Sequence, residues 1–140
     1  MRKVAKIIGY TILGIFAFVC IIFTSLFFRY ETQSDQIHTA VNSFVHEMTV
    51  PNSKILPSLT HPQFYPDLVK LLNENQQSFL NVDHVSEQKY YFSYHAATGG
   101  ETTEYKGDIF FKGGPTENIV LKLIKKDGAW VVYGIEIQNK

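Results

Sequence analysis

The most constraining feature of the sequence is an uncharged run near its start. Residues 7–28 read IIGYTILGIFAFVCIIFTSLFF, twenty-two residues without a charge, and fourteen of them are Ile, Leu, Phe or Val. A helix of that length spans about 33 Å, which matches the hydrocarbon thickness of a bilayer. Each of these apolar residues contributes about 0.3–0.6 kcal/mol to insertion. The run therefore predicts a transmembrane helix in contact with membrane lipid.

The basic residues around this run predict its orientation. Arg2, Lys3 and Lys6 precede it, whereas only Arg29 follows it closely. Because positive residues concentrate on the cytoplasmic side, we expect the N-terminus inside and the rest of the chain outside the bacterial cytoplasmic (inner) membrane. The predicted parts are a cytoplasmic tail (1–6), the span (7–28), a polar linker (29–34) and an extracytoplasmic domain (35–140).

A cleavable signal peptide is the alternative interpretation of the same run. The apolar run is longer than the usual 7–15 residues of a signal peptide, and no small-x-small cleavage site follows it. Cys20, the only cysteine, lies inside the run, so it cannot form a disulfide within the outer domain. We therefore favour an uncleaved membrane anchor.

Two helical patterns follow the span. Thr32-x-x-Asp35 is typical of a helix start. Apolar residues then recur with helical spacing until Pro51, at Ile37, Ala40, Val41, Phe44, Val45 and Met48. A second helix is expected to start at Thr60-His61-Pro62 or at Tyr65-Pro66. Its apolar face carries Leu68, Leu71, Leu72, Phe79 and Leu80.

From Glu87 onward the apolar period changes from helical to two. Strands are expected at 90–96, 104–111, 118–126 and 129–137, separated by turns that contain glycine. Asp127-Gly128 between two apolar runs is a strong hairpin signal. The predicted fold class is α+β, with an N-terminal transmembrane helix and then two helices packed on a curved four-stranded antiparallel meander.

The closing hairpin also resembles that of a known family. Residues 121–135, LKLIKKDGAWVVYGI, are similar to the last hairpin of the nuclear-transport-factor-2-like (cystatin-like) superfamily, and the helix order agrees across 35–137. The resemblance implies a curved sheet cupped around helices. The superfamily includes enzymes, dimerising adaptors and membrane-tethered assembly proteins, so fold alone does not determine function. A type IV secretion inner-membrane component and an oxidase assembly factor stay as alternatives.

Few side chains in the outer domain indicate chemistry. An enzyme of the ketosteroid-isomerase type needs a carboxylate in an apolar pocket that faces a phenol, but Asp108 lies opposite the apolar face of its strand and is expected to be solvated. The five histidines lack metal-binding spacing, and 13 basic residues balance 13 acidic ones. We therefore expect no catalytic residue, no metal, no cofactor and no nucleic-acid partner.

The last hairpin is apolar on both faces if its strands pair without irregularity. One face then carries Ile119, Leu121, Leu123, Trp130 and Val132, and the other carries Val120, Ile124, Val131, Tyr133 and Ile135. An antiparallel sheet with one wet side should alternate cleanly. Either sheet curvature and chain ends cover the second face, or a partner surface or a second copy does.

We hypothesise that the outer domain is a non-catalytic protein-binding or assembly module. Its partner would be another membrane protein or a second copy of the chain. The expected partner-binding residues are Phe110, Val120, Val131, Tyr133 and Ile135.

A cup that binds a small molecule or lipid is the alternative function. Such a cup needs an apolar cavity of several hundred cubic ångströms beneath the helices, whereas a packed core would exclude it. The expected lining residues are Tyr90, Phe92, Tyr94, Phe111 and Trp130.

Overall fold

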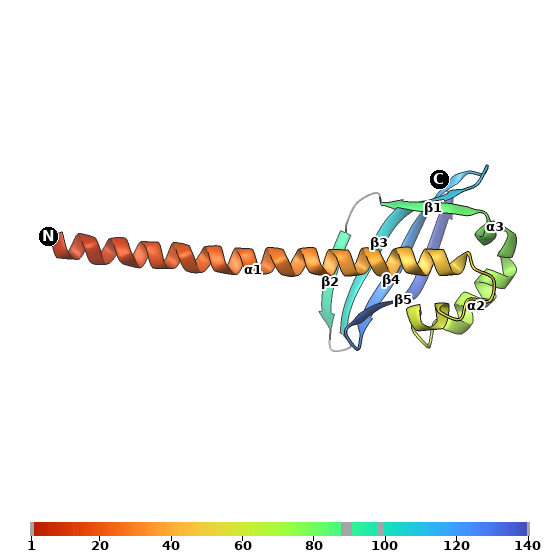
Figure 1. Cartoon of the computed structure of the whole chain (residues 1–140), viewed down its shortest axis with the longest axis horizontal. Coiled ribbons are helices and arrows are strands. Elements are labelled where there is room, and N and C mark those ends of the chain that lie inside the picture. The colour runs from red at the N-terminus through yellow and green to blue at the C-terminus, as the bar shows by residue number, and fades with distance from the viewer. Residues whose placement is uncertain (1, 88–90, 98–99, 140) are drawn as a thin grey trace. The chain divides into compact units, whose positions relative to one another are not determined.

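The chain folds as an α+β protein in two compact units, Met1–Asp35 and Gln36–Lys140. The computed structural model describes the backbone of residues 2–87, 91–97 and 100–139, and the side chains of residues 10–86 and 100–138. The helices are α1 (Arg2–Met48), the 3-10 helix η1 (Leu56–Leu59), α2 (Tyr65–Glu74) and α3 (Gln76–Leu80). The strands are β1 (Val82–Glu87), β2 (Tyr91–Ala97), β3 (Gly100–Phe111), β4 (Thr116–Lys126) and β5 (Ala129–Asn139) (Figure 1).

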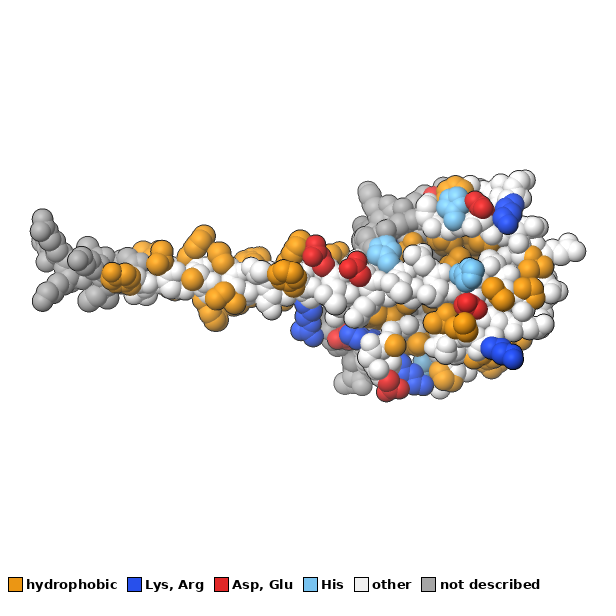
Figure 2. Space-filling model, in the orientation of Figure 1, with side chains coloured by type: hydrophobic (Ala, Val, Ile, Leu, Met, Phe, Trp, Pro, Cys, Tyr) orange, Lys and Arg blue, Asp and Glu red, His pale blue; other side chains and the backbone are white. Residues whose placement is uncertain are grey.

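The first unit is an apolar stretch of α1. Its side chains are exposed throughout residues 10–32, and Figure 2 shows hydrophobic side chains along this helix. The most apolar window of α1 has a mean hydropathy of 2.5 and is 0% buried. A helix that is apolar on all sides and not covered by protein is typical of a membrane span. By length and composition, α1 can therefore cross a membrane once.

α1 continues through the segment where we expected a linker and a new helix. Thr32 Oγ1 donates a hydrogen bond to the Phe28 carbonyl oxygen at 2.9 Å, which is a bond of the helix interior and not of a cap. The predicted helix start at Thr32 is therefore wrong. Residues 15–50 contain neither glycine nor proline. Nothing in this stretch stops the helix before Met48, three residues ahead of Pro51.

In the second unit, the last turns of α1 cover one face of the sheet. The apolar positions predicted for this helix are buried, with Ile37, Val41, Phe44, Val45 and Met48 each at most 8% exposed. They pack against strand residues that are 0% exposed, namely Ile109, Ile119, Leu121, Leu123 and Val132. Full burial of such a side chain contributes about 1.5–3 kcal/mol. This helix-on-sheet layer is the core of the domain.

The second predicted helix is divided. α2 begins at Tyr65 with Pro66 in its first turn, which is one of the two expected starts. At Asn75 the backbone leaves the helical conformation (φ −123°, ψ 27°), and α3 follows. Leu80 was expected on the apolar face but is 43% exposed. The break explains this, because α3 does not keep the helical phase of α2.

All pairings in the sheet are antiparallel. β3 pairs with β4 and β4 with β5, while β1 and β2 both pair with β3 along one edge. β1 adds a fifth strand to the four that we expected. Its sequence, VDHVSE, has few strand-forming residues, so the pairing with the second half of β3 stabilises it and local propensity does not.

The closing hairpin begins in the predicted register. Asp127 (φ 51°) and Gly128 (φ 82°) both have positive φ, as a type I′ turn requires. Ile124 pairs with Val131, and Leu123 pairs with Val132. The two-residue loop is therefore confirmed.

A β-bulge then changes the register of β5. Lys122 pairs with Gly134, which leaves Tyr133 as an extra residue. Beyond the bulge, Leu121 pairs with Ile135, and Ile135 packs against the core. The prediction that Ile135 lies on the second face is wrong, because a shift of one residue moves every later side chain of a strand to the other face.

Two glycines of the sheet allow a matched test of packing. A Cβ at buried Gly107 would lie 2.7 Å from the Ser86 carbonyl oxygen of β1, whereas at Gly134 the nearest atom is the flexible Lys122 Cδ at 3.2 Å. We expect Gly107→Ala to lower the free energy of unfolding by about 1–3 kcal/mol. Gly134→Ala should change it by less than about 0.5 kcal/mol. Chemical unfolding of the full chain in detergent measures both, and equal effects would contradict the packing at Gly107.

Candidate functional site

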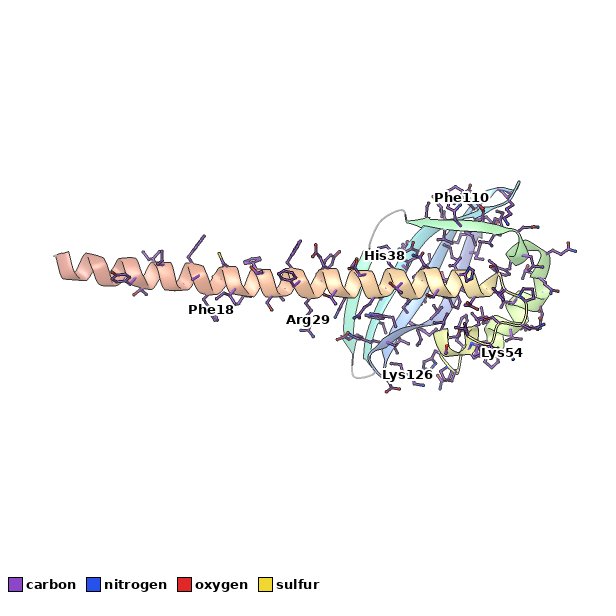
Figure 3. The ribbon with its side chains drawn as sticks, in the orientation of Figure 1. Phe18, Arg29, His38, Lys54, Phe110 and Lys126 are labelled. Carbon is purple, nitrogen blue, oxygen red and sulfur yellow. The ribbon has the colours of Figure 1, made fainter. Side chains whose placement is uncertain are left out.

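The five predicted partner-binding residues do not form one surface. Val131 is buried at 8% exposure, and Ile135 faces the core layer. Phe110 lies near the β3–β4 turn, where its ring stacks on His84 with centroids 4.4 Å apart. Figure 3 places Phe110 and Lys126 at different ends of the sheet. Val120 is half-buried and Tyr133 is 36% exposed, so Tyr133 is the most exposed of the five.

The face of the sheet opposite the core is mostly polar. Val120 lies between charged residues of the neighbouring strands, because its cross-strand partners are Lys106 and Glu136. Lys122 Nζ donates a hydrogen bond to Glu136. This bond and the charge of Glu136 raise the pKa of Lys122 above its usual value. The bulge thus leaves a wet outer face around Val120 where strict alternation predicted an apolar one.

The carboxylate of Asp108 and the phenol of Tyr105, the one tyrosine on β3, do not face each other. Asp108 is 6% exposed, so the expectation that it is solvated is wrong. Tyr105, which is also buried, belongs to the core cluster. Their odd separation of three residues puts the two side chains on opposite faces of the strand. They do not form an isomerase-type pair.

The predicted ligand cup is not lined by its expected residues. Tyr90 lies outside the described residues, and so do the side chains of Phe92 and Tyr94. Trp130 is 5% exposed and belongs to the core. Phe111 is the last residue of β3, whereas Trp130 follows the β4–β5 turn, so the two side chains lie at opposite ends of β4. Phe111 lines a pocket beside the β3–β4 turn.

The helical cover ends before the second half of β5. Leu121 and Ile119 on β4 are 0% exposed, but their cross-strand partners Ile135 and Ile137 are only half-buried. These two isoleucines pack against the core from the margin of the sheet. The domain therefore leaves an apolar strip only partly covered at this strand.

The free edge of β5 is partly occupied in its first half. Thr60 forms an isolated bridge with Val132, and the His61 amide donates a hydrogen bond to the Val132 carbonyl oxygen at 2.7 Å. β4 is the one strand that pairs with β5 in the described chain. From Tyr133 to Gln138, no described strand covers the other edge.

Two pockets flank this open half of β5. The end pocket, of about 460 Å³, is lined by Leu71, Asn75, Ser78, Phe79, Asn81, Phe111, Lys112, Gly114, Pro115, Glu117 and Ile137. The bulge pocket, of about 330 Å³, is lined by His61, Gln63, Phe64, Asp67, Ile124 and Tyr133. Figure 1 shows α2 and α3 beside the sheet in this region.

The same two elements contribute to both pockets. α2 supplies Asp67 to the bulge pocket and Leu71 to the end pocket, while β5 supplies Tyr133 and Ile137 to the same two pockets. We refer to these two pockets together, which α2 and β5 both line, as the α2–β5 groove. Sequence analysis found Tyr133 but missed the α2 residues, because they were explained by the helical core pattern.

Charged side chains of both signs lie at the α2–β5 groove. Asp67 lines the bulge pocket together with His61. Glu117 lines the end pocket together with Lys112, the one basic side chain among the residues that line it. Glu136 lies on the exposed side of β5 and pairs with Lys122.

Comparisons of the chain with models of protein families, with curated proteins and with solved structures gave no match.

The different burial of Val131 and Tyr133 makes a matched test of the site. Val131→Asp would bury an unpaired carboxylate, so we expect the free energy of unfolding to fall by about 2–4 kcal/mol. Tyr133→Asp places the same charge at an exposed bulge and should cost less than about 1 kcal/mol. Fluorescence of Trp130, the single tryptophan, reports unfolding of the full chain in denaturant. A larger loss at Tyr133 than at Val131 would contradict this assignment.

Proposed function

We propose that this chain is a single-pass membrane protein whose α+β domain is a non-catalytic protein-binding or assembly module. The domain would lie outside the bacterial cytoplasmic membrane, with the N-terminus inside. We also propose that it is a small member of the nuclear-transport-factor-2-like superfamily with a curved sheet. The helix-on-sheet core and the closing hairpin at Asp127-Gly128 support this relationship.

The observation that carries the binding function is the open half of β5. Ile135 and Ile137 face the core layer but are left half-exposed, although their cross-strand partners Leu121 and Ile119 on β4 are 0% exposed. An apolar strip next to two pockets is the kind of surface that protein partners cover. Tethering favours such a role, because confinement near a membrane raises the effective concentration toward membrane partners and makes weak contacts sufficient.

A second candidate function is binding of a small molecule or lipid in the end pocket. Its volume of about 460 Å³ lies within the range of ligand sites, about 300–1,000 Å³. Leu71, Phe79, Phe111 and Ile137 supply apolar walls, and Asn81 and Lys112 supply polar groups at its border. A ligand with an apolar body and a polar end would suit it.

The proposed topology predicts the behaviour of reporter fusions. Alkaline phosphatase fused after Lys140 should be active, because that enzyme matures outside the cytoplasm, and a fluorescent protein at the same point should stay dark. Arg2, Lys3 and Lys6 determine this orientation. The intact mass of the membrane-extracted protein should include residues 1–28. A fluorescent fusion, or loss of those residues by cleavage, would contradict the proposal.

Photo-cross-linking in the native membrane tests the binding function. A photoreactive amino acid at Asp67, which lines the bulge pocket, or at Asn75, which lines the end pocket, should form an adduct with one discrete protein. Lys126 is the control, because it is exposed and lies beside the β4–β5 turn. Equal adducts at all three positions, or none at Asp67 and Asn75, would contradict a binding site in this groove.

A further inference from the structure

We propose that the end pocket binds a zwitterionic ligand, a molecule with an apolar body that carries one ammonium group and one anionic group. The ammonium group would pair with Glu117 and the anionic group with Lys112, two of the residues that line this pocket. This inference rests on the second candidate function, ligand binding in the end pocket, and specifies the chemistry of the ligand.

The negative group of the site lies on the core side of β4. Successive residues of a strand alternate between its faces, so Glu117 shares a face with Ile119 and Leu121, which are 0% exposed. Its cross-strand partner on β3 is Ile109, which is also 0% exposed. Glu117 itself is half-buried. A carboxylate that is partly removed from water beside apolar side chains is stabilised by a positive group that pairs with it.

The positive group of the site comes from the β3–β4 turn. Lys112 directly follows β3, and its backbone amide donates a hydrogen bond to the Asn81 carbonyl oxygen at 2.7 Å. This bond fixes the backbone of Lys112 beside the C-terminal end of α3. Lys112 and Glu117 are five residues apart in the sequence. The turn between β3 and β4 thus brings both charges to the border of one pocket.

The two charges do not neutralise each other. Within the described residues, no ion pair involves Lys112 or Glu117. A ligand with only a positive charge would bring that charge toward Lys112, and a ligand with only a negative charge would bring it toward Glu117. A zwitterion can satisfy both side chains, so the pocket favours it over either singly charged ligand.

The inner wall of the pocket suits the apolar body of such a ligand. Phe79 is 4% exposed, and Leu71, Phe111 and Ile137 are half-buried. A pocket with apolar walls and a small number of polar groups at fixed positions is the usual form of a small-molecule site. The same chemistry occurs in a free amino acid with a large apolar side chain and in phosphatidylethanolamine, whose phosphate and amine form a zwitterionic head group.

The test compares ligands of different charge on the full chain by isothermal titration calorimetry. The chain is held in nanodiscs of phosphatidylglycerol, a lipid without an amine, and empty nanodiscs supply the blank. The two zwitterionic probes are phenylalanine and dihexanoyl phosphatidylethanolamine. The singly charged analogues are phenylalanine amide, N-acetylphenylalanine and dihexanoyl phosphatidylglycerol.

At least one zwitterionic probe should bind about tenfold more tightly than its singly charged analogues, because each analogue lacks one charged contact. Tight binding of phenylalanine alone would identify a soluble ligand. Tight binding of phosphatidylethanolamine alone would identify a lipid.

Two variants assign the charged contacts. Glu117→Gln should weaken binding of the zwitterion by about tenfold without weakening the anionic analogue, and Lys112→Met should weaken the zwitterion equally without weakening the cationic analogue. Asp67→Asn and Lys126→Met remove the same charges outside the end pocket, and each should change binding by less than about twofold. Unfolding followed by Trp130 fluorescence checks that the variants fold, and the analogue series on the unaltered chain gives the answer independently if one does not.

Three results would overturn the inference. The first is that neither zwitterion binds, the second is that a singly charged analogue binds as tightly as the zwitterion, and the third is that Glu117→Gln and Lys112→Met leave zwitterion binding unchanged. In the second case the pocket still binds a ligand, and only the zwitterionic chemistry is wrong. If no probe of any charge binds, the second candidate function is wrong as well. Photo-cross-linking at Asp67 and Asn75 tests the protein-binding function separately from these measurements.

Discussion

The packing of one helical face on one face of the sheet is the interaction on which the rest of the domain depends. The last turns of α1 supply Val41 and Phe44 to this layer, and β4 supplies Ile119, Leu121 and Leu123, all of them completely buried. Because β4 lies in the middle of the sheet, the cover is complete there and incomplete at β5. The open strip at Ile135 and Ile137 is therefore a consequence of where the helix lies. A single bulge residue, Tyr133, turns those two side chains toward the core layer and not toward the wet face.

Features carried by short-range patterns could be predicted from the sequence. Asp127-Gly128 specified the turn and the first pairs of the hairpin, since residues that tolerate positive φ favour the type I′ turn. The helical spacing from Ile37 to Met48 identified the buried face of α1. The uncharged run at 7–28 identified the part of α1 that can span a membrane. In each case the residues that carry the pattern are the same residues that form the structural element.

Features that depend on distant contacts were missed or assigned wrongly. The bulge at Tyr133 has no local mark, and strict alternation beyond it placed Ile135 on the wrong face. β1 is stabilised by its pairing with β3 and not by its own sequence. The α2–β5 groove brings Asp67 and Leu71 of α2 together with Tyr133 and Ile137 of β5, which lie more than sixty positions later in the chain. Thr32 and Asp35 have the sequence pattern of a helix cap, but no glycine or proline interrupts the helix there. α1 therefore continues through Thr32, and the predicted cap does not form. Candidate sites built from two distant elements are the part of the function that pattern analysis cannot assemble.

The unbroken course of α1 has a consequence for the order of events during synthesis. The helix that supplies one half of the core is made directly after the apolar run, whereas Val132, on the other half, is made 84 residues after Met48. At about 5–20 residues per second, translation takes about 4–17 seconds to cover that interval. During that time Ile37, Val41 and Phe44 have no sheet to pack against. In a newborn chain this apolar stripe therefore stays without its packing partner until the final hairpin is made.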